Sequence, residues 1–259
     1  KTAAARLQST RAMTISRSSA RDLETILRIP ADKIDVITEG PDAAFKPLAV
    51  DRAAVRAKFE IGAQAPVLVY VGGFNRHKNV VSLLNAMKDV ARDRPDAVLV
   101  VVGDLSGRGF WDNRDELLET VRGDAALSKC VKFPGYVPDA ALADLFNAAD
   151  AMVFPSLWEG FGLPAVEAMA CGLPVLSSNV SSLPEIVGDA GVYFDPYKER
   201  EISGAIMTFL NAPQDWAALR ARALAQAQKF NWARAAELAE ICFRKAVKRA
   251  EKDRETQPL

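Results

Sequence analysis

Short, continuous runs of apolar residues recur along the middle of this 259-residue chain. Six of them lack the alternation of a strand with one wet face: Val67–Gly72, Ala97–Gly103, Val131–Phe133, Ala151–Pro155, Pro174–Ser177 and Gly191–Phe194. A continuous apolar pattern is typical of strands that are covered on both faces. The pattern therefore predicts six buried strands.

Helices are predicted between these runs. After the first run, apolar residues stand at helical spacing on one face, namely Val80, Leu83, Leu84, Met87 and Val90. Similar helices are predicted at Arg114–Val121, Asp139–Ala148, Pro164–Cys171 and Glu199–Leu210. Alternating strands and helices predict an α/β fold with a Rossmann-like, doubly wound parallel sheet, whose ligand crevice lies beyond the carboxyl ends of the strands.

The two ends of the chain do not continue this alternation. Residues 1–27 resemble a helix, a short strand at Ala12–Ser16 and a second helix, but residues 1–29 contain no βα partners of their own. Because the chain begins with Lys1 and not with Met, we predict that residues 1–29 are the tail of a preceding domain. Residues 30–230 are the predicted Rossmann-like domain, and residues 231–259 are predicted to be mainly a helix.

The charge balance bears on binding partners. Lys plus Arg and Asp plus Glu each total 33, which gives a formal net charge of zero at pH 7. No overall field therefore draws the chain to nucleic acid or to an anionic membrane. A hydrophobic content of 49% is sufficient for a sizeable core.

Cysteine and histidine usage bears on location and on metal binding. Cys130, Cys171 and Cys242 are odd in number and widely spaced, with no C-x-x-C pair, and His77 is the only histidine. We interpret the cysteines as reduced core thiols of a cytoplasmic protein, and we predict no metal site. No apolar run is as long as a membrane span, and no signal peptide is recognisable.

The most informative stretch leads from the fourth apolar run through a glycine-containing turn into a predicted helix. Glu159 and Glu167 stand on either side of this turn. Gly160 and Gly162 let the backbone approach a ligand closely, and Pro164 fits the start of the helix. Such a turn directs free backbone N–H groups and the positive end of the helix dipole at one volume, which favours an anion such as phosphate.

Two carboxylates would repel a phosphate alone, so their expected partners are the hydroxyls of a polyol. Phosphate together with polyol indicates a sugar nucleotide. In a simpler interpretation, Glu167 is a solvated carboxylate and Glu159 caps a backbone N–H group. Spacing alone does not exclude that interpretation.

A second glycine turn follows the first apolar run. Gly72 and Gly73 end the predicted strand, and Arg76 and Lys78 precede the next helix. This combination predicts a second phosphate-binding loop, in which arginine offers a planar fork and lysine a point charge. The simpler alternative for the two cations is an ordinary solvated loop. His77, which lies between them, is given no role.

Both loops resemble motifs of one enzyme family. The first resembles the E-x7-E signature of the family 4 retaining glycosyltransferases, which have the GT-B fold, and consists here of Glu159, Gly160, Phe161, Gly162, Pro164 and Glu167. Tyr70–Asn79 resembles that family's phosphate-binding loop, and its sequence is most similar to that of bacterial mannosyltransferases. The match runs from about Ile34 to Val247. It implies the C-terminal, donor-binding half of a GT-B fold.

The resemblance implies catalytic roles for three residues. In the family, the phosphate-binding loop holds the donor diphosphate beside Gly72 and Gly73, and Lys78 would neutralise the leaving group. Many relatives have an arginine where this chain has Gly73, and Arg76 is expected to replace it. Glu159 would reach the hydroxyls of the donor sugar.

The remaining matched residues would bind the donor. Glu167 would accept hydrogen bonds from the ribose, and backbone amides would approach sugar and phosphate at Gly160, Phe161, Gly162 and Leu163. Tyr136 and Val137 match a segment that lies along the nucleobase, mostly through main-chain contacts. Ser181 and Ser182 also match the family, although helix capping explains them equally well.

The predicted function is retaining, metal-independent and cofactor-free glycosyl transfer from a nucleotide-diphosphate sugar. GDP-mannose is the expected donor, and a glycan or a lipid-linked molecule is the expected acceptor. A missing N-terminal domain would hold the acceptor, pack against residues 231–259, and make any contact with the inner face of a membrane. This chain alone is therefore not expected to transfer sugar. Two alternatives stay open: a GT-B-like sugar-nucleotide epimerase, and a non-catalytic module that binds sugar nucleotides.

Overall fold

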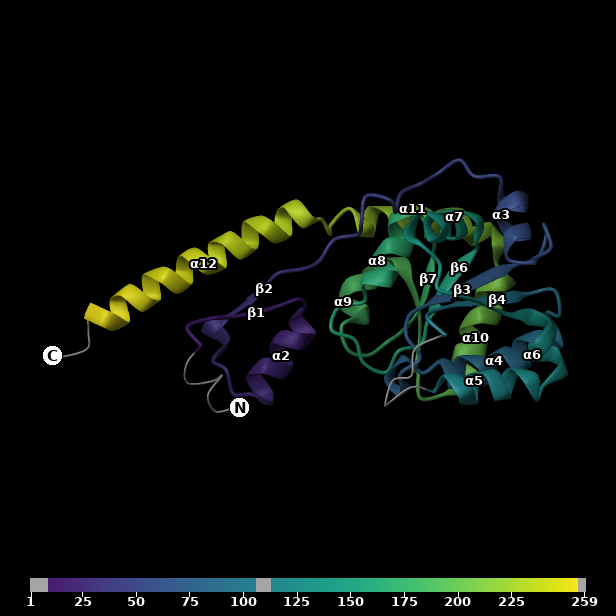
Figure 1. The fold of residues 1–259 in the computed structure, drawn as a ribbon, viewed down its shortest axis with the longest axis horizontal. Coiled ribbons are helices and arrows are strands. Elements are labelled where there is room, and N and C mark those ends of the chain that lie inside the picture. The colour runs from purple at the N-terminus through teal and green to yellow at the C-terminus, as the bar shows by residue number, and fades with distance from the viewer. Residues whose placement is uncertain (1–8, 106–112, 256–259) are drawn as a thin grey trace. The chain divides into compact units, whose positions relative to one another are not determined.

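The structure, a computed structural model, describes residues 9–105 and 113–255. The chain divides into two compact units (Figure 1). The larger unit is Asp42–Lys229, and the smaller one combines Lys1–Pro41 with Phe230–Leu259. Among the described residues, no helix has both the length and the apolar character needed to cross a membrane.

A six-stranded sheet, parallel throughout, forms the centre of the larger unit (Figure 1). The order of its strands is β5-β4-β3-β6-β7-β8. These are β3 (Val67–Val71), β4 (Val98–Val102), β5 (Val131–Gly135), β6 (Ala151–Phe154), β7 (Val175–Ser178) and β8 (Gly191–Phe194). The six predicted strands and the doubly wound parallel sheet are confirmed.

Helices pack on both faces of this sheet (Figure 1). One face carries α4 (Val80–Asp93), α5 (Arg114–Arg122), α6 (Ala125–Cys130) and α10 (Glu199–Leu210). The other carries α3 (Arg52–Lys58), α7 (Asp139–Ala148), α8 (Leu163–Ala170) and α11 (Trp216–Ala227). Shorter helical segments are η2 (Arg76–Lys78), α9 (Leu183–Val187), η3 (Gly188–Ala190) and η4 (Pro213–Asp215).

The core of this unit follows from the apolar pattern. The first four residues of β3 and all four of β6 are buried, as strands covered on both faces require. The predicted apolar stripe of α4 is also buried, at Val80, Leu83, Leu84, Met87 and Val90. Burial of such side chains supplies most of the driving force for folding.

The smaller unit joins segments from both ends of the chain. Its elements are β1 (Ala12–Thr14), α2 (Arg17–Thr25), η1 (Ala31–Lys33), β2 (Ile34–Val36) and α12 (Trp232–Glu255). Because β1 and β2 pair in parallel, the predicted boundary at residue 30 falls between two paired strands. Residues 1–8 of the predicted tail lie outside the described residues. That residues 1–29 end a preceding domain stays a prediction.

Asp35 of β2 connects the two ends of the chain within this unit. Its carboxylate accepts hydrogen bonds from Arg11 Nε at 2.5 Å and from Lys245 Nζ of α12 at 2.8 Å. Burial by itself raises the pKa of the Asp35 carboxyl, but the hydrogen bonds from Arg11 and Lys245 outweigh it and hold the pKa well below its ordinary value. The charged form of Asp35 therefore stabilises this unit.

We predict that Asp35→Asn lowers the free energy of unfolding of this unit by about 2 kcal/mol at neutral pH, since it removes two hydrogen bonds to a charged acceptor. The folded-state pKa is lowered, so the stabilisation is full above the ordinary carboxyl pKa and is lost as the pH falls toward the folded value. Hydrogen exchange of the α12 amides at neutral and acidic pH measures this. Asp32→Asn is the matched control, because the pair that Asp32 makes with Arg249 is exposed. Equal losses of stability in Asp35→Asn and Asp32→Asn would contradict the conclusion that the charged form of Asp35 stabilises this unit.

Candidate functional site

The two predicted loops leave the sheet at its topological switch point. Strand order reverses between β3 and β6, which pair in the middle of the sheet. Gly72 and Gly73 follow the end of β3 at Val71, and the glutamate turn follows the end of β6 at Phe154. In doubly wound sheets the ligand crevice lies at this point, outside the carboxyl ends of the strands.

A buried tyrosine sets the shape of the first loop. Tyr70 is fully buried in β3, and its hydroxyl donates a hydrogen bond to the carbonyl oxygen of Gly73 at 2.6 Å. A Cβ atom at Gly72 would lie 2.8 Å from that hydroxyl oxygen, so only glycine fits there. Burial raises the pKa of Tyr70 well above its ordinary value, and the charge of Glu159 adds to the effect. The hydroxyl therefore stays protonated and remains a donor.

Hydrogen bonds join the first loop to the second. The backbone N–H of Leu157 donates to the carbonyl oxygen of His77 at 2.7 Å. Asn79, which has a φ of 58°, donates from Nδ2 to the carbonyl oxygens of Pro155 at 3.2 Å and Pro196 at 2.8 Å. Asn79 thus connects the loops that follow β3, β6 and β8.

Lys78 and Glu159 form an ion pair between the two loops. Lys78 Nζ lies 2.7 Å from Glu159 Oε1, and the two side chains are 18% and 10% exposed. The ammonium group also lies 5.9 Å from the centroid of the Phe154 ring, within the range of a cation–π interaction. Two residues that are 81 positions apart in the sequence are therefore in direct contact.

Two serines hold the backbone on both sides of Gly160. Ser181 Oγ accepts from the N–H of Glu159 at 3.0 Å and donates to its carbonyl oxygen at 2.8 Å. Ser182 Oγ donates to the carbonyl oxygen of Phe161 at 2.8 Å. The capping explanation of Ser182 is wrong, because its side chain makes no capping bond at the start of α9. Ser181 has a φ of 61°, a strained value for a residue other than glycine, and these bonds keep it there.

The structure does not bring every predicted site residue into this contact. Arg76 is exposed in η2 and, within the described part of the chain, forms no ion pair. Glu167 lies partly buried on α8. Tyr136 and Val137 follow β5, two strands from β3 at the same edge, with Tyr136 72% exposed and Val137 buried.

The predicted backbone contacts all fall on the turn that opens α8. Gly162 is the residue before this helix and has a φ of 107°, while Leu163 is its first residue. Phe161 is buried, whereas Gly160 and Leu163 are partly exposed. Gly162 is also buried, so the turn covers the Phe161 side chain and leaves Gly160 and Leu163 partly accessible on either side.

Several supporting residues were missed from the sequence. They are Tyr70 and Asn79, together with the roles of Ser181 and Ser182. The hydroxyl of Ser156, two residues after β6, is buried and makes no hydrogen bond with any other described residue. Asn79 carried a signal, since asparagine before a helix is among the few residues that readily adopt a left-handed backbone.

We predict that Gly162→Ala lowers the free energy of unfolding by about 2 kcal/mol. The positive φ of this position is unfavourable for alanine, and the added Cβ atom would lie 2.9 Å from Leu183 Cδ2. Chemical denaturation of both proteins measures the difference. Gly73→Ala is the matched control. Its Cβ would meet no described atom within 4 Å and its φ is not positive, so a change within about 0.5 kcal/mol is expected. Equal decreases in the free energy of unfolding of the two variants would contradict the prediction that Gly162 is required by the backbone conformation of this turn.

Comparison with protein families identifies the chain. Residues 51–230 match the model of the family described as glycosyl transferases group 1. The chain belongs to this family. The matched range contains both loops of the switch point, so the family assignment covers the sheet and the candidate site together.

Individual relatives agree with this family. The chain is 34% identical to O-antigen chain mannosyltransferase B of Escherichia coli over 221 residues, which are 85% of this chain and 56% of the relative. It is 34% identical to D-inositol 3-phosphate glycosyltransferase of Segniliparus rotundus over 219 residues, which are 83% of this chain and 48% of the relative. The chain thus spans about half the length of these relatives.

A solved structure supports the fold assignment. Sucrose-phosphate synthase of Thermosynechococcus elongatus superposes with a TM-score of 0.78 at 28% sequence identity, covering 91% of this chain and 58% of that one. The glycosyltransferase fold class predicted from the two loops is confirmed. The family resemblance to bacterial mannosyltransferases is confirmed as well, because a mannosyltransferase is among the matching relatives.

Proposed function

We propose that this chain supplies the donor site of a retaining hexosyltransferase, which uses a nucleotide-diphosphate sugar. The supporting observation is the meeting of two loops at the switch point, with Lys78 Nζ 2.7 Å from Glu159 Oε1. Membership of the group 1 family supports glycosyl transfer. GDP-mannose is the first candidate donor, because the Escherichia coli relative is named a mannosyltransferase.

Lys78 would act on the leaving diphosphate. An ammonium group has three N–H donors, and one of them is directed at Glu159. The other two are available to phosphate oxygens. Negative charge develops on the diphosphate as the bond to the sugar breaks, so a cation already in place stabilises the transition state more than the bound substrate.

Glu159 would both position Lys78 and hold the sugar. Its Oε1 atom accepts from Lys78, while its Oε2 atom makes no hydrogen bond with another described residue. A carboxylate oxygen is a strong acceptor for a sugar hydroxyl. The two serine hydroxyls that hold the backbone of this turn would keep Oε2 in place during the reaction.

The other matched residues would complete the donor site. Glu167 would bind the ribose hydroxyls, and the main chain of Tyr136 and Val137 would lie along the nucleobase. Arg76, which is exposed and has no ion-pair partner among the described residues, would reach the diphosphate only when the donor is bound. No metal or other cofactor is required in this scheme.

The acceptor would bind to a separate N-terminal domain. The chain spans about half the length of its relatives, which supports a second half elsewhere in the protein. Helix α12 exposes apolar side chains on which that domain would pack, namely Trp232, Ile241, Phe243 and Val247. The acceptor would be a glycan or a lipid-linked molecule. The protein would act in the cytoplasm and touch the inner membrane surface only through that half.

Calorimetric titration of the 259-residue chain tests the donor site. We expect GDP-mannose and GDP to bind more tightly than UDP-glucose and UDP, and we expect EDTA to leave these affinities unchanged. Tighter binding of the uridine compounds would refute GDP-mannose as the donor but would still support a donor site in this chain. No binding of any of the four at millimolar concentrations would overturn the donor site itself.

Lys78→Ala in the full-length protein tests the catalytic assignment. We expect kcat to fall by about a hundredfold, since one charged donor to the leaving group is removed. The variant also leaves the Glu159 carboxylate unpaired, so its free energy of unfolding is measured beside kcat, and kcat is compared under conditions in which the variant is folded. Lys88→Ala is the matched control, because Lys88 is exposed on the following helix, and it should leave kcat unchanged. An unchanged kcat in Lys78→Ala would refute the role of this residue.

A further inference from the structure

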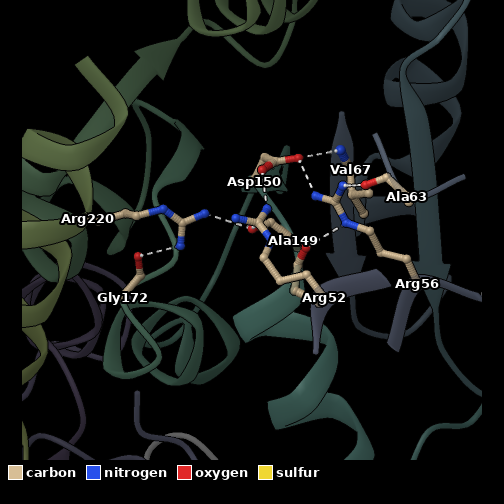
Figure 2. A network of polar contacts seen from close by, with 9 residues as sticks. Arg52, Arg56, Ala63, Val67, Ala149, Asp150, Gly172 and Arg220 are labelled. Carbon is tan, nitrogen blue, oxygen red and sulfur yellow. Dashed lines mark hydrogen bonds and ion pairs between the residues drawn. The ribbon is translucent and has the colours of Figure 1, made fainter. Parts of the chain in front are cut away.

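A cluster of three arginines lies at the opposite edge of the sheet from the proposed donor site (Figure 2). Asp150 directly precedes β6, and its Oδ2 atom accepts from the backbone N–H of Val67, the first residue of β3, at 2.8 Å. The amino ends of β3 and β6 therefore meet here. The donor site proposed above lies beyond their carboxyl ends.

One carboxylate serves two of the arginines. Asp150 Oδ2 lies 3.0 Å from Arg56 Nη2, and Asp150 Oδ1 lies 2.5 Å from Arg52 Nη2. Arg56 is buried, and its other donors are directed at the carbonyl oxygens of Ala148 at 3.0 Å and Ala63 at 2.7 Å. Each nitrogen of the Arg56 guanidinium group therefore has a hydrogen-bond partner, whereas Arg52 bonds to described residues only through its Nη2 atom.

The third arginine has no carboxylate partner. Arg220 of α11 donates to the carbonyl oxygen of Ala149 at 2.8 Å and approaches that of Gly172 at 3.5 Å, and it forms no ion pair with any described residue. Arg52 Nη2 lies 3.4 Å from the same oxygen of Ala149, so two cations converge on one carbonyl (Figure 2).

Positive charge therefore exceeds negative charge at this point. Burial lowers the pKa of Arg220, and the nearby charge of Arg52 adds to the effect, while the charge of Asp150 opposes it. Burial likewise lowers the pKa of Arg56, with Asp150 opposing it. Asp51 is also close, but its Oδ1 atom accepts from the N–H of Ala54 at the start of α3. Three guanidinium groups and two carboxylates leave one positive charge, and a partly buried cation without a counter-ion is costly.

An open cavity of about 610 Å³ lies beside Arg52, with Asp51, Arg52, Arg56, Gln64, Asp150 and Trp216 in its wall. Arg220 is not one of the described residues that line it, and its charge acts on the cavity through Arg52. The side chain of Arg52 is 44% exposed, and its Nε and Nη1 atoms make no hydrogen bond with any described residue. Two donors of a planar fork are therefore available on the wall of the cavity. Such a fork matches the oxygens of a phosphate group.

We propose that this cavity binds a phosphate-type oxyanion, held by Arg52 and serving as the counter-ion of the arginine cluster. Trp216 offers an apolar surface for the organic part of a phosphate ester. A soluble phosphate compound and the headgroup of a phospholipid present the same chemistry. The site is separate from the donor site and does not depend on the function proposed for it.

Titration of the 259-residue chain with inorganic phosphate, at constant ionic strength, tests the proposal. We expect saturable binding that Arg52→Gln weakens by about tenfold or more, and that Arg220→Gln, which removes a nearby charge and no direct contact, weakens by less. Arg92→Gln is the control and should bind as the wild type does, whereas Lys78→Gln removes the proposed phosphate contact of the donor loop, so the binding that this variant keeps is that of the cavity. Arg92 is an exposed arginine of α4, and Lys78 reports on the proposed donor loop. Backbone NMR shifts of Gln64 and Ala65 should move on addition of phosphate, which needs no variant.

The outcomes separate the proposal from its rivals. Absence of saturable binding, or binding that Lys78→Gln abolishes and Arg52→Gln preserves, would overturn it. Unmoved signals of Gln64 and Ala65 at saturation would overturn it too. Co-sedimentation with phosphatidylcholine vesicles that contain phosphatidic acid, lost in Arg52→Gln, would identify the oxyanion as a lipid headgroup. Binding of inorganic phosphate without such co-sedimentation would identify a soluble compound.

Discussion

The pairing of β3 with β6 in the middle of the sheet is the constraint on which the rest of this structure depends. These strands are far apart in the sequence, and the order of the sheet reverses between them. At their carboxyl ends, the pairing brings two glycine turns together, so Lys78 can reach Glu159. At their amino ends, it brings Asp150 to the first residue of β3. One strand pair thus positions two polar sites at opposite edges of the sheet.

The charged groups at the two edges of the sheet are balanced differently. At the carboxyl edge, one cation meets one carboxylate, and both keep hydrogen-bonding capacity for a ligand. At the amino edge, Arg52 and Arg56 share the carboxylate of Asp150, whereas Arg220 is directed, among the described residues, at backbone carbonyl oxygens alone. The first arrangement is balanced before any ligand binds. The second has an excess of positive charge, which a bound anion would balance.

The candidate site is held mainly by groups that would not touch a donor. Tyr70 fixes the first loop from inside the sheet, Asn79 connects three loops, and Ser181 with Ser182 holds the glutamate turn. Functional side chains need such support, because small displacements weaken charged contacts and slow reactions. The strained backbone of Ser181 lies next to the residue that it supports, as is common near functional sites.

Much of the fold could be predicted from the sequence alone. Continuous apolar runs determined the six strands, the stripe from Val80 to Val90 determined the buried face of α4, and the two glycine turns indicated the family. These features are local, since each depends on residues a few positions apart and on the period of a strand or helix. The domain boundary that we predicted at residue 30 was harder to derive from the sequence. Strand β2, which follows residue 30, pairs with β1, which precedes it, and not with a strand of the main sheet.

Only the tertiary structure decided which side chains meet. The contacts of Lys78 with Glu159, of Ser181 with Glu159 and of Arg220 with Ala149 join residues that are 81, 22 and 71 positions apart. No local pattern encodes such contacts, because strand order and helix packing set them. For the same reason the serines resembled helix caps in the sequence, and the arginine cluster left no motif. The sequence determined the elements and the family, whereas the packing of β3 against β6 decided the chemistry at both edges.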